Sequence, residues 1–204
     1  MSPAIACIMP IDLALAGVSP WAAAALAVVL VSAAVVDLRY KKVPNWLTYP
    51  AIAAGLLGHG LCGWLAGSDG QLGLLGSLAG LAVGFFPLAL CWLAGGIGGG
   101  DAKLAGAIGA LGGWRLALSA LVYGIIVAAI MAVVVMVRRR LLRRTLRRVW
   151  HTLVLLVSRA ARPADPTSAD SPTIPFAVAL CVGAAGAMLE PLVRRGVEIL
   201  LAGG

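Results

Sequence analysis

LALSALVYGIIVAAIMAVVVMV is the stretch from Leu116 to Val137, and it holds no charged side chain. As an α-helix it would extend about 33 Å at 1.5 Å per residue, which matches the roughly 30 Å hydrocarbon core of a bilayer. Lipid offers no hydrogen-bond partner to the backbone, so an apolar stretch of this length is stable in a membrane as a helix. The sequence therefore predicts a membrane-spanning helix here.

The composition of the whole chain agrees with a bilayer as its solvent. Its 204 residues are 61% hydrophobic and 12% charged, whereas about 25% of the residues of a soluble domain are charged. The net charge of +8 does not indicate nucleic-acid binding, because only 6% of the residues are aromatic and no soluble basic domain is evident. We expect the lipid bilayer, and no nucleic acid, as a partner.

Five more apolar segments complete the expected fold, an all-α polytopic membrane protein with about six transmembrane helices. Four of them are expected spans: residues 20–36, 46–66, 72–94 and 174–189. The fifth, residues 102–113, would extend only about 18 Å as a helix, and it follows the glycine-rich run 95–100. We expect a short fourth helix whose glycine-rich entry loop dips below the membrane surface. Irregular backbone at that depth must be buried in protein or face a water-filled cavity, so this loop marks a candidate site.

The basic residues divide unevenly between the two sides of these spans. Thirteen of the 16 fall on one side: Arg39, Lys41, Lys42, Lys103 and the basic residues within 138–162. The other three are Arg115, Arg194 and Arg195. Because Lys and Arg accumulate in cytosolic loops, the first side is predicted to face the cytosol and both termini the outside.

A single membrane-embedded domain is expected over residues 1–204, with one unusual insertion. Residues 138–162 place arginines on one helical face and leucines on another, which predicts a basic amphipathic helix on the cytosolic leaflet. Residues 163–173 are rich in Pro and Ser and predict a flexible linker before the last helix.

Small residues recur at every fourth position in two of the expected helices. Gly76, Gly80 and Gly84 share one face of the third span, and Ala105, Gly109 and Gly113 share one face of the fourth. This spacing predicts close packing of helices, because small side chains let backbones approach.

Two of the eight acidic residues fall where chemistry is expected. Asp12, Asp69, Glu190 and Glu198 are predicted outside, and Asp165 and Asp170 in the linker. Asp37 and Asp101 remain, each at the cytosolic edge of an apolar helix. An ionisable side chain at membrane depth costs about 2.5–3.5 kcal/mol on insertion scales, so it is usually functional.

A pair of carboxylates can hydrolyse a peptide bond without a metal or a cofactor. Like charges a few ångströms apart share one proton, so that one carboxylate acts as base on a water and the other polarises the carbonyl. Asp101 follows Asp37 by 64 positions, so the pair requires the first and fourth helices to be neighbours. No HExxH or CxxC motif is present, and no metal is expected.

The residues around both acids resemble the type IV prepilin peptidase family of GxGD-type membrane aspartic proteases. Residues 37–48, DLRYKKVPNWLT, show an aspartate, a basic stretch and Pro-Asn before a new span. Residues 98–104, GGGDAKL, match the GxGDxK pattern, and residues 174–180, IPFAVAL, look like the opening of the family's last helix. The resemblance covers roughly residues 31–189.

The resemblance implies an endopeptidase with Asp37 and Asp101 as its catalytic residues. Its substrate would be a prepilin or pseudopilin, whose short basic leader precedes an apolar helix and is removed at the cytosolic face of the bacterial inner membrane. The residues expected to shape the site or bind substrate are Gly98, Gly99, Gly100, Lys103, Arg39, Pro44 and Asn45. Glycines give a substrate backbone close access, and Pro44 and Asn45 are expected to start the second helix. The basic side chains are more simply explained as topology anchors.

Larger family members carry an N-terminal methylating domain with paired CxxC motifs, which is not expected here. The chain is similar to the short, peptidase-only branch of tight-adherence pilus systems, so pilus or secretion machinery is a further expected partner. The main alternative is a small ion- or proton-coupled transporter that uses Asp37 and Asp101, since transporters have broken helices. A presenilin-like protease, whose Pro-Ala-Leu motif is missing, and a structural secretion subunit are weaker alternatives.

Overall fold

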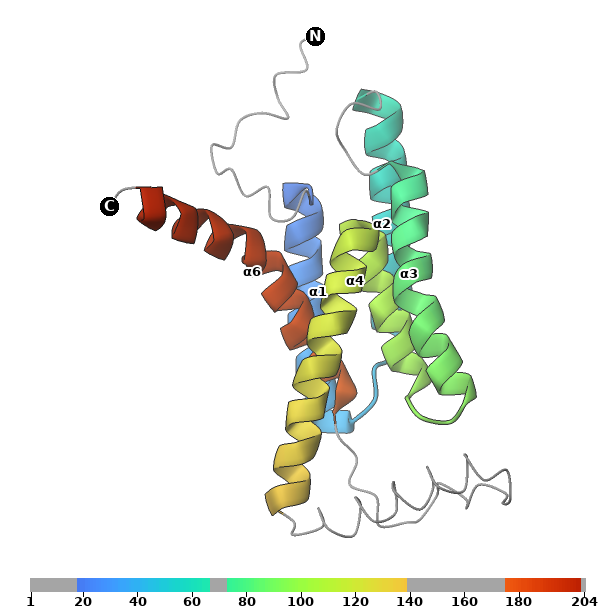
Figure 1. Cartoon of the computed structure of the whole chain (residues 1–204). Helices are drawn as coiled ribbons and strands as arrows, with labels where there is room; N and C mark the ends of the chain where they lie inside the picture. Colours follow the sequence, from blue (N-terminus) through green and yellow to red (C-terminus); the bar gives the residue numbers. More distant parts are fainter. Residues whose placement is uncertain (1–17, 67–72, 139–174, 203–204) are drawn as a thin grey trace, which may run out of the picture. The chain divides into compact units, whose positions relative to one another are not determined.

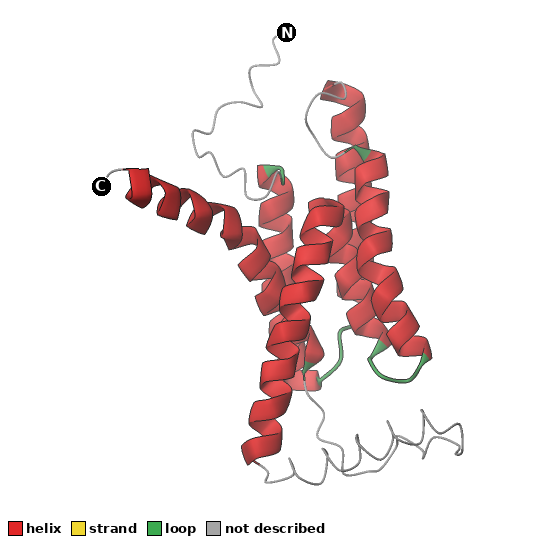
Figure 2. Cartoon of the chain, in the orientation of Figure 1, coloured by secondary structure: helices red, strands yellow, loops and turns green. Residues whose placement is uncertain are grey.

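The computed structural model describes residues 18–66, 73–138 and 175–202, and all regular structure within them is helical (Figures 1 and 2). Five helices follow one another along this part of the chain: α1 (Pro20–Tyr40), α2 (Asn45–Ala66), α3 (Leu74–Leu93), α4 (Gly99–Arg138) and α6 (Phe176–Ala202). The predicted all-α fold is thereby confirmed for the described residues.

Three of the described helices, α1, α3 and α4, are long and apolar enough to cross a membrane. The apolar part of α6, Phe176–Pro191, is shorter. These helices confirm a membrane protein, while the count of six spans stays a prediction. The amphipathic segment and linker predicted over 138–173 lie outside the described residues, apart from Arg138 at the end of α4.

The chain divides into two compact units. The first comprises residues 1–127 and 175–204, and the second comprises residues 128–174. The first unit holds α1, α2, α3, the greater part of α4, and α6, and it contains every residue of the candidate site. The expected single domain over the whole chain stays a prediction.

Helix α1 is longer than predicted and carries Asp37 in its last turn. It ends at Tyr40, and Lys41 caps it in the left-handed conformation (φ 52°, ψ 33°), with its N–H donating to the carbonyl of Asp37 at 2.8 Å. Pro44 precedes the first residue of α2, Asn45, as predicted. Residues 41–44 are thus a short connection that begins beside Asp37.

Gly113 interrupts α4 where the sequence predicts one helix to end and another to begin. Its backbone (φ 78°, ψ 175°) is not helical and lies in a region open almost only to glycine. Figure 1 shows that the ribbon of α4 reverses direction part-way along its length. Residues 99–112 therefore form a short arm that ends in the protein interior, and both arms carry the label α4.

The end of this short arm is stabilised by two buried side chains from neighbouring helices. A helix leaves its last carbonyls without intrahelical partners, and buried carbonyls need hydrogen bonds. His59 of α2 donates from Nε2 to the carbonyl of Leu111 at 2.9 Å, and Ser77 of α3 donates to the carbonyl of Ala110 at 2.6 Å. Both side chains are at most 1% exposed. These bonds fix the short arm against α2 and α3.

Glycines allow the short arm and α3 to touch through their backbones. A Cβ atom at Gly80 would collide with the carbonyl of Gly109, and one at Gly84 would collide with the carbonyl of Ala105. The predicted close packing of these two small-residue faces is confirmed at these positions. Elsewhere in this unit, α1 packs against α2 and α6.

Candidate functional site

Asp37 lies buried where the last turn of α1 meets the first turn of α6. Its side chain is 4% exposed. Its carboxylate accepts a hydrogen bond from the backbone N–H of Val178 at 3.3 Å, and the N–H of Ala177 is directed at it as well. The first N–H groups of a helix lack intrahelical partners and attract negative charge. Asp37 therefore caps α6 from a different helix.

Asp101 lies in the first turn of α4, as the sequence predicts, and is half-buried. Its N–H donates to the carbonyl of Gly98 at 3.1 Å, and its carboxylate accepts the N–H of Gly98. This is the reciprocal arrangement of a helix-capping acid at the third helical position. A side chain at Gly98 would bring its Cβ to 3.3 Å from Asp101 Oδ2, so glycine there leaves the carboxylate uncovered.

The fold brings Asp37 and Asp101 to one place despite their separation in the sequence. The charges of the two carboxylates interact, and the sulfur of Cys181 is within range of both. Cys181 lies on α6 and is 5% exposed. The sequence did not single out this cysteine, because a lone Cys in an apolar helix is usually a small hydrophobic side chain.

The connection between α1 and α2 packs directly on the glycine run before Asp101. A Cβ at Gly100 would lie 2.8 Å from the carbonyl oxygen of Val43. Gly99 faces the indole of Trp92, whose nearest atom would lie 3.2 Å from a Cβ there. Gly99 and Gly100, two of the three predicted site glycines, are thus positions of close packing, which keep the start of α4 against its neighbours.

Lys103 joins the start of α4 to the start of α2. Its Nζ donates to Asn45 Oδ1 at 2.8 Å and lies 4.9 Å from the centroid of the Tyr49 ring. Both contacts are made to α2, so Lys103 and Asn45 join the first turns of the two helices. Arg39 is exposed in the last turn of α1, where the helix dipole stabilises a positive charge.

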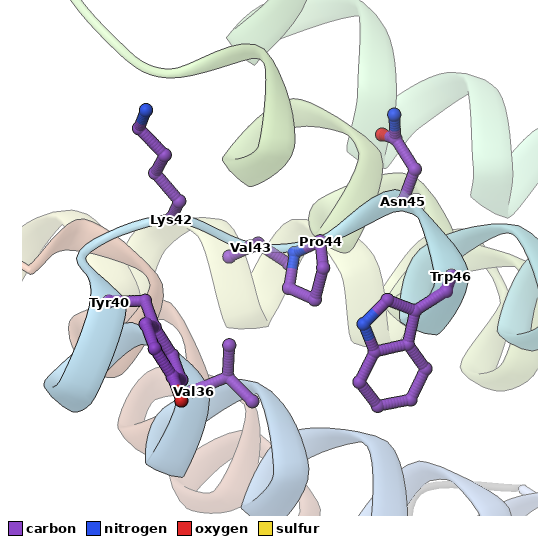
Figure 3. Close-up of a pocket in the computed structure, with 7 residues that line it drawn as sticks. All are labelled: Val36, Tyr40, Lys42, Val43, Pro44, Asn45 and Trp46. Atoms are coloured by element: carbon purple, nitrogen blue, oxygen red, sulfur yellow. The ribbon is translucent and has the colours of Figure 1, made fainter.

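A cavity of about 600 Å³ opens beside this connection (Figure 3). Its lining consists of Val36, Tyr40, Lys42, Val43, Pro44, Asn45 and Trp46. Two of these are predicted site residues, Pro44 and Asn45. Val36 immediately precedes Asp37 in the chain, so the cavity extends to the last turns of α1, where Asp37 lies. In the described residues no group of three or more His, Cys, Asp or Glu side chains could hold a metal ion.

The sequence left two main classes of membrane protein open, a peptidase and an ion- or proton-coupled transporter, and comparison with known families separates them. The model of the type IV leader peptidase family matches residues 24–133, which is more than half of the chain. The chain belongs to the type IV leader peptidase family. The resemblance found in the sequence is thereby confirmed. No curated protein and no solved structure matches the chain significantly.

The matched range of this leader peptidase includes both aspartates, the connection between α1 and α2, and the glycine run. It stops before α6, whose backbone N–H groups bond to Asp37. The family and the apolar helices together make this chain a membrane peptidase.

Proposed function

We propose that this leader peptidase is an aspartic endopeptidase that uses Asp37 and Asp101 to remove the short basic leader of prepilin-like substrates. The observation that carries the proposal is the meeting of two carboxylates, 64 positions apart, within electrostatic range at one end of the bundle. Family membership supports the peptidase over an ion-coupled transporter.

The chemistry of the proposed pair needs one proton shared between the two carboxyl groups. The ionised carboxylate takes a proton from a water, whose oxygen attacks the carbonyl carbon of the scissile amide. The protonated carboxyl donates to the carbonyl oxygen as it gains negative charge. When the tetrahedral intermediate collapses, the C–N bond breaks and the leaving nitrogen takes up a proton, which regenerates the pair.

The charge distribution supports a cytosolic site in the bacterial inner membrane. Arg39, Lys41 and Lys42 lie within five positions of Asp37, and Lys103 lies two positions after Asp101. Lysine and arginine favour the cytosolic side of membrane helices. A substrate anchored in the same membrane would present the junction between leader and apolar helix at this depth, and we propose pilus or secretion components as the partners that receive the product.

Leader removal from a co-expressed prepilin, followed as a gel shift, tests the proposal. Asp37→Asn and Asp101→Asn should each abolish processing while the protein still inserts in the membrane, because neither variant can share the proton. Glu198→Gln is the matched control, since Glu198 is an exposed acid on α6, and it should process normally. Cleavage that persists in either aspartate variant rules out the pair. No cleavage by the wild type would favour the transporter.

A further inference from the structure

The cavity beside the connection between α1 and α2 has one apolar side and one polar side. Figure 3 shows the side chains of Val36, Tyr40, Pro44 and Trp46 on one side of the connection, whereas Lys42 and the Asn45 amide point to the other. Tyr40 and Trp46 are 71% and 67% exposed, so the apolar side is open to an incoming group. At about 600 Å³, the space lies within the range of pockets that hold small ligands, roughly 300–1,000 Å³.

Two residues of the lining connect this cavity to the segments that carry the acids. Val36 precedes Asp37 in the last turns of α1. Val43 packs on Gly100, the residue before Asp101. A peptide whose scissile bond lies at the two carboxylates therefore has one flanking side chain within reach of the cavity.

We propose that this cavity is a specificity pocket for the first large apolar side chain on the mature side of the scissile bond. The inference rests on the proposed function. The leader of such a substrate is basic, and the exposed Lys42 at the rim, with Arg39 and Lys41 nearby, repels it. The segment after the cleavage point is apolar and matches the aliphatic and aromatic lining. Charge and apolarity thus assign the pocket to the mature side.

Exposed aromatic residues near a helix end also occur as plain interfacial anchors. An anchor affects membrane insertion, and its effect does not depend on the side chain that follows the scissile bond. A pocket discriminates between side chains, because a large apolar group gains affinity only where it fits. Substrate discrimination therefore separates the two roles.

The experiment uses the full-length enzyme in vesicles and four prepilin substrates that carry Ala, Leu, Phe or Trp directly after the scissile bond. Val36→Phe fills the pocket and should lower kcat/KM for the Phe and Trp substrates at least about tenfold, largely through KM. Its cleavage of the Ala substrate should fall much less, and a melting temperature near that of the wild type would show that the variant folds. Trp46→Ala should reduce the preference for Phe over Ala by a similar factor.

Trp64→Ala is the matched control, because Trp64 is an aromatic side chain 83% exposed at the other end of α2. It should leave the order of the four substrates unchanged. Equal effects of Val36→Phe on all four substrates, or no effect on any, would overturn the proposed specificity pocket. Such a result would favour lipid as the occupant of the cavity. A wild-type enzyme that cleaves none of the four would overturn the proposed function itself, which is a different result.

Discussion

At Asp37 a single carboxylate meets two demands of different kinds. It accepts the backbone N–H of Val178 at the start of α6, and in the proposed reaction it also exchanges a proton. The first demand needs only an oxygen acceptor, whereas the second needs an acid. Substitutions that keep or remove the acceptor therefore separate stability from chemistry.

Asp37→Ala should lower the free energy of unfolding by about 1–2 kcal/mol, because it leaves the capped N–H groups buried and unpaired. Asp37→Asn keeps an oxygen acceptor and should melt close to wild type, although it no longer cleaves. Thermal unfolding of both variants in detergent measures the difference. Equal melting of Asp37→Ala and wild type would show that the cap contributes nothing.

Gly100 packs against the connection between α1 and α2 and directly precedes Asp101 in the chain. Gly100→Ala places a Cβ 2.8 Å from the carbonyl oxygen of Val43, so the start of α4 must shift. Small displacements of a catalytic group cost up to about a hundredfold, and we expect leader processing to slow at least tenfold. Gly73→Ala is the control, because a Cβ there meets nothing within 4 Å. Normal rates in Gly100→Ala would show that the connection can yield.

At the scale of elements, the short arm of α4 positions Asp101, and its far end is fixed by side chains. His59 and Ser77 bond to the carbonyls of Leu111 and Ala110 just before the break at Gly113. Because the arm is a rigid helix, a shift of this end would also displace its first turn. The two bonds therefore help to hold Asp101 in place, although they lie at the opposite end of the arm.

His59→Phe should destabilise the protein by about 1–3 kcal/mol, since the carbonyl of Leu111 would remain buried without a donor. His59→Gln retains an N–H donor and should recover part of that loss. Thermal unfolding compares the two, and processing by His59→Phe should fall below processing by His59→Gln. If His59→Phe melts above His59→Gln, packing of the ring rather than its hydrogen bond is what matters.

The helices could largely be predicted from the sequence, whereas the contacts between them could not. Apolar runs located the helices, and the glycine run with Asp101 located the start of α4, because hydropathy and glycine are local signals. The bond from Asp37 to α6 could not be predicted, since its donors are backbone N–H groups that nearly every residue carries. Lys103 was expected near Asp101, but its bond to Asn45 depends on how α2 and α4 pack, which no local pattern encodes.

For the whole molecule, the orientation in the membrane follows from charge and is open to direct test. In a variant whose four cysteines are replaced by alanine, Arg39→Cys should react with a membrane-impermeant maleimide only when the cytosolic side is accessible. Gly73→Cys, at the start of α3, should react only from the opposite side, because the predicted span over residues 46–66 separates the two positions. Labelling of intact spheroplasts and inverted vesicles provides the comparison. Reaction of both positions from one side would contradict the proposed topology.

The bond between Asp37 and α6 has a consequence for the newly made protein. Ribosomes synthesise α6 after the other four described helices, so both acids enter the bilayer before the backbone that caps Asp37 exists. The nascent chain therefore passes through a stage that holds the acids without their finished surroundings. Biogenesis itself would thus delay proteolytic competence until the last helix has docked.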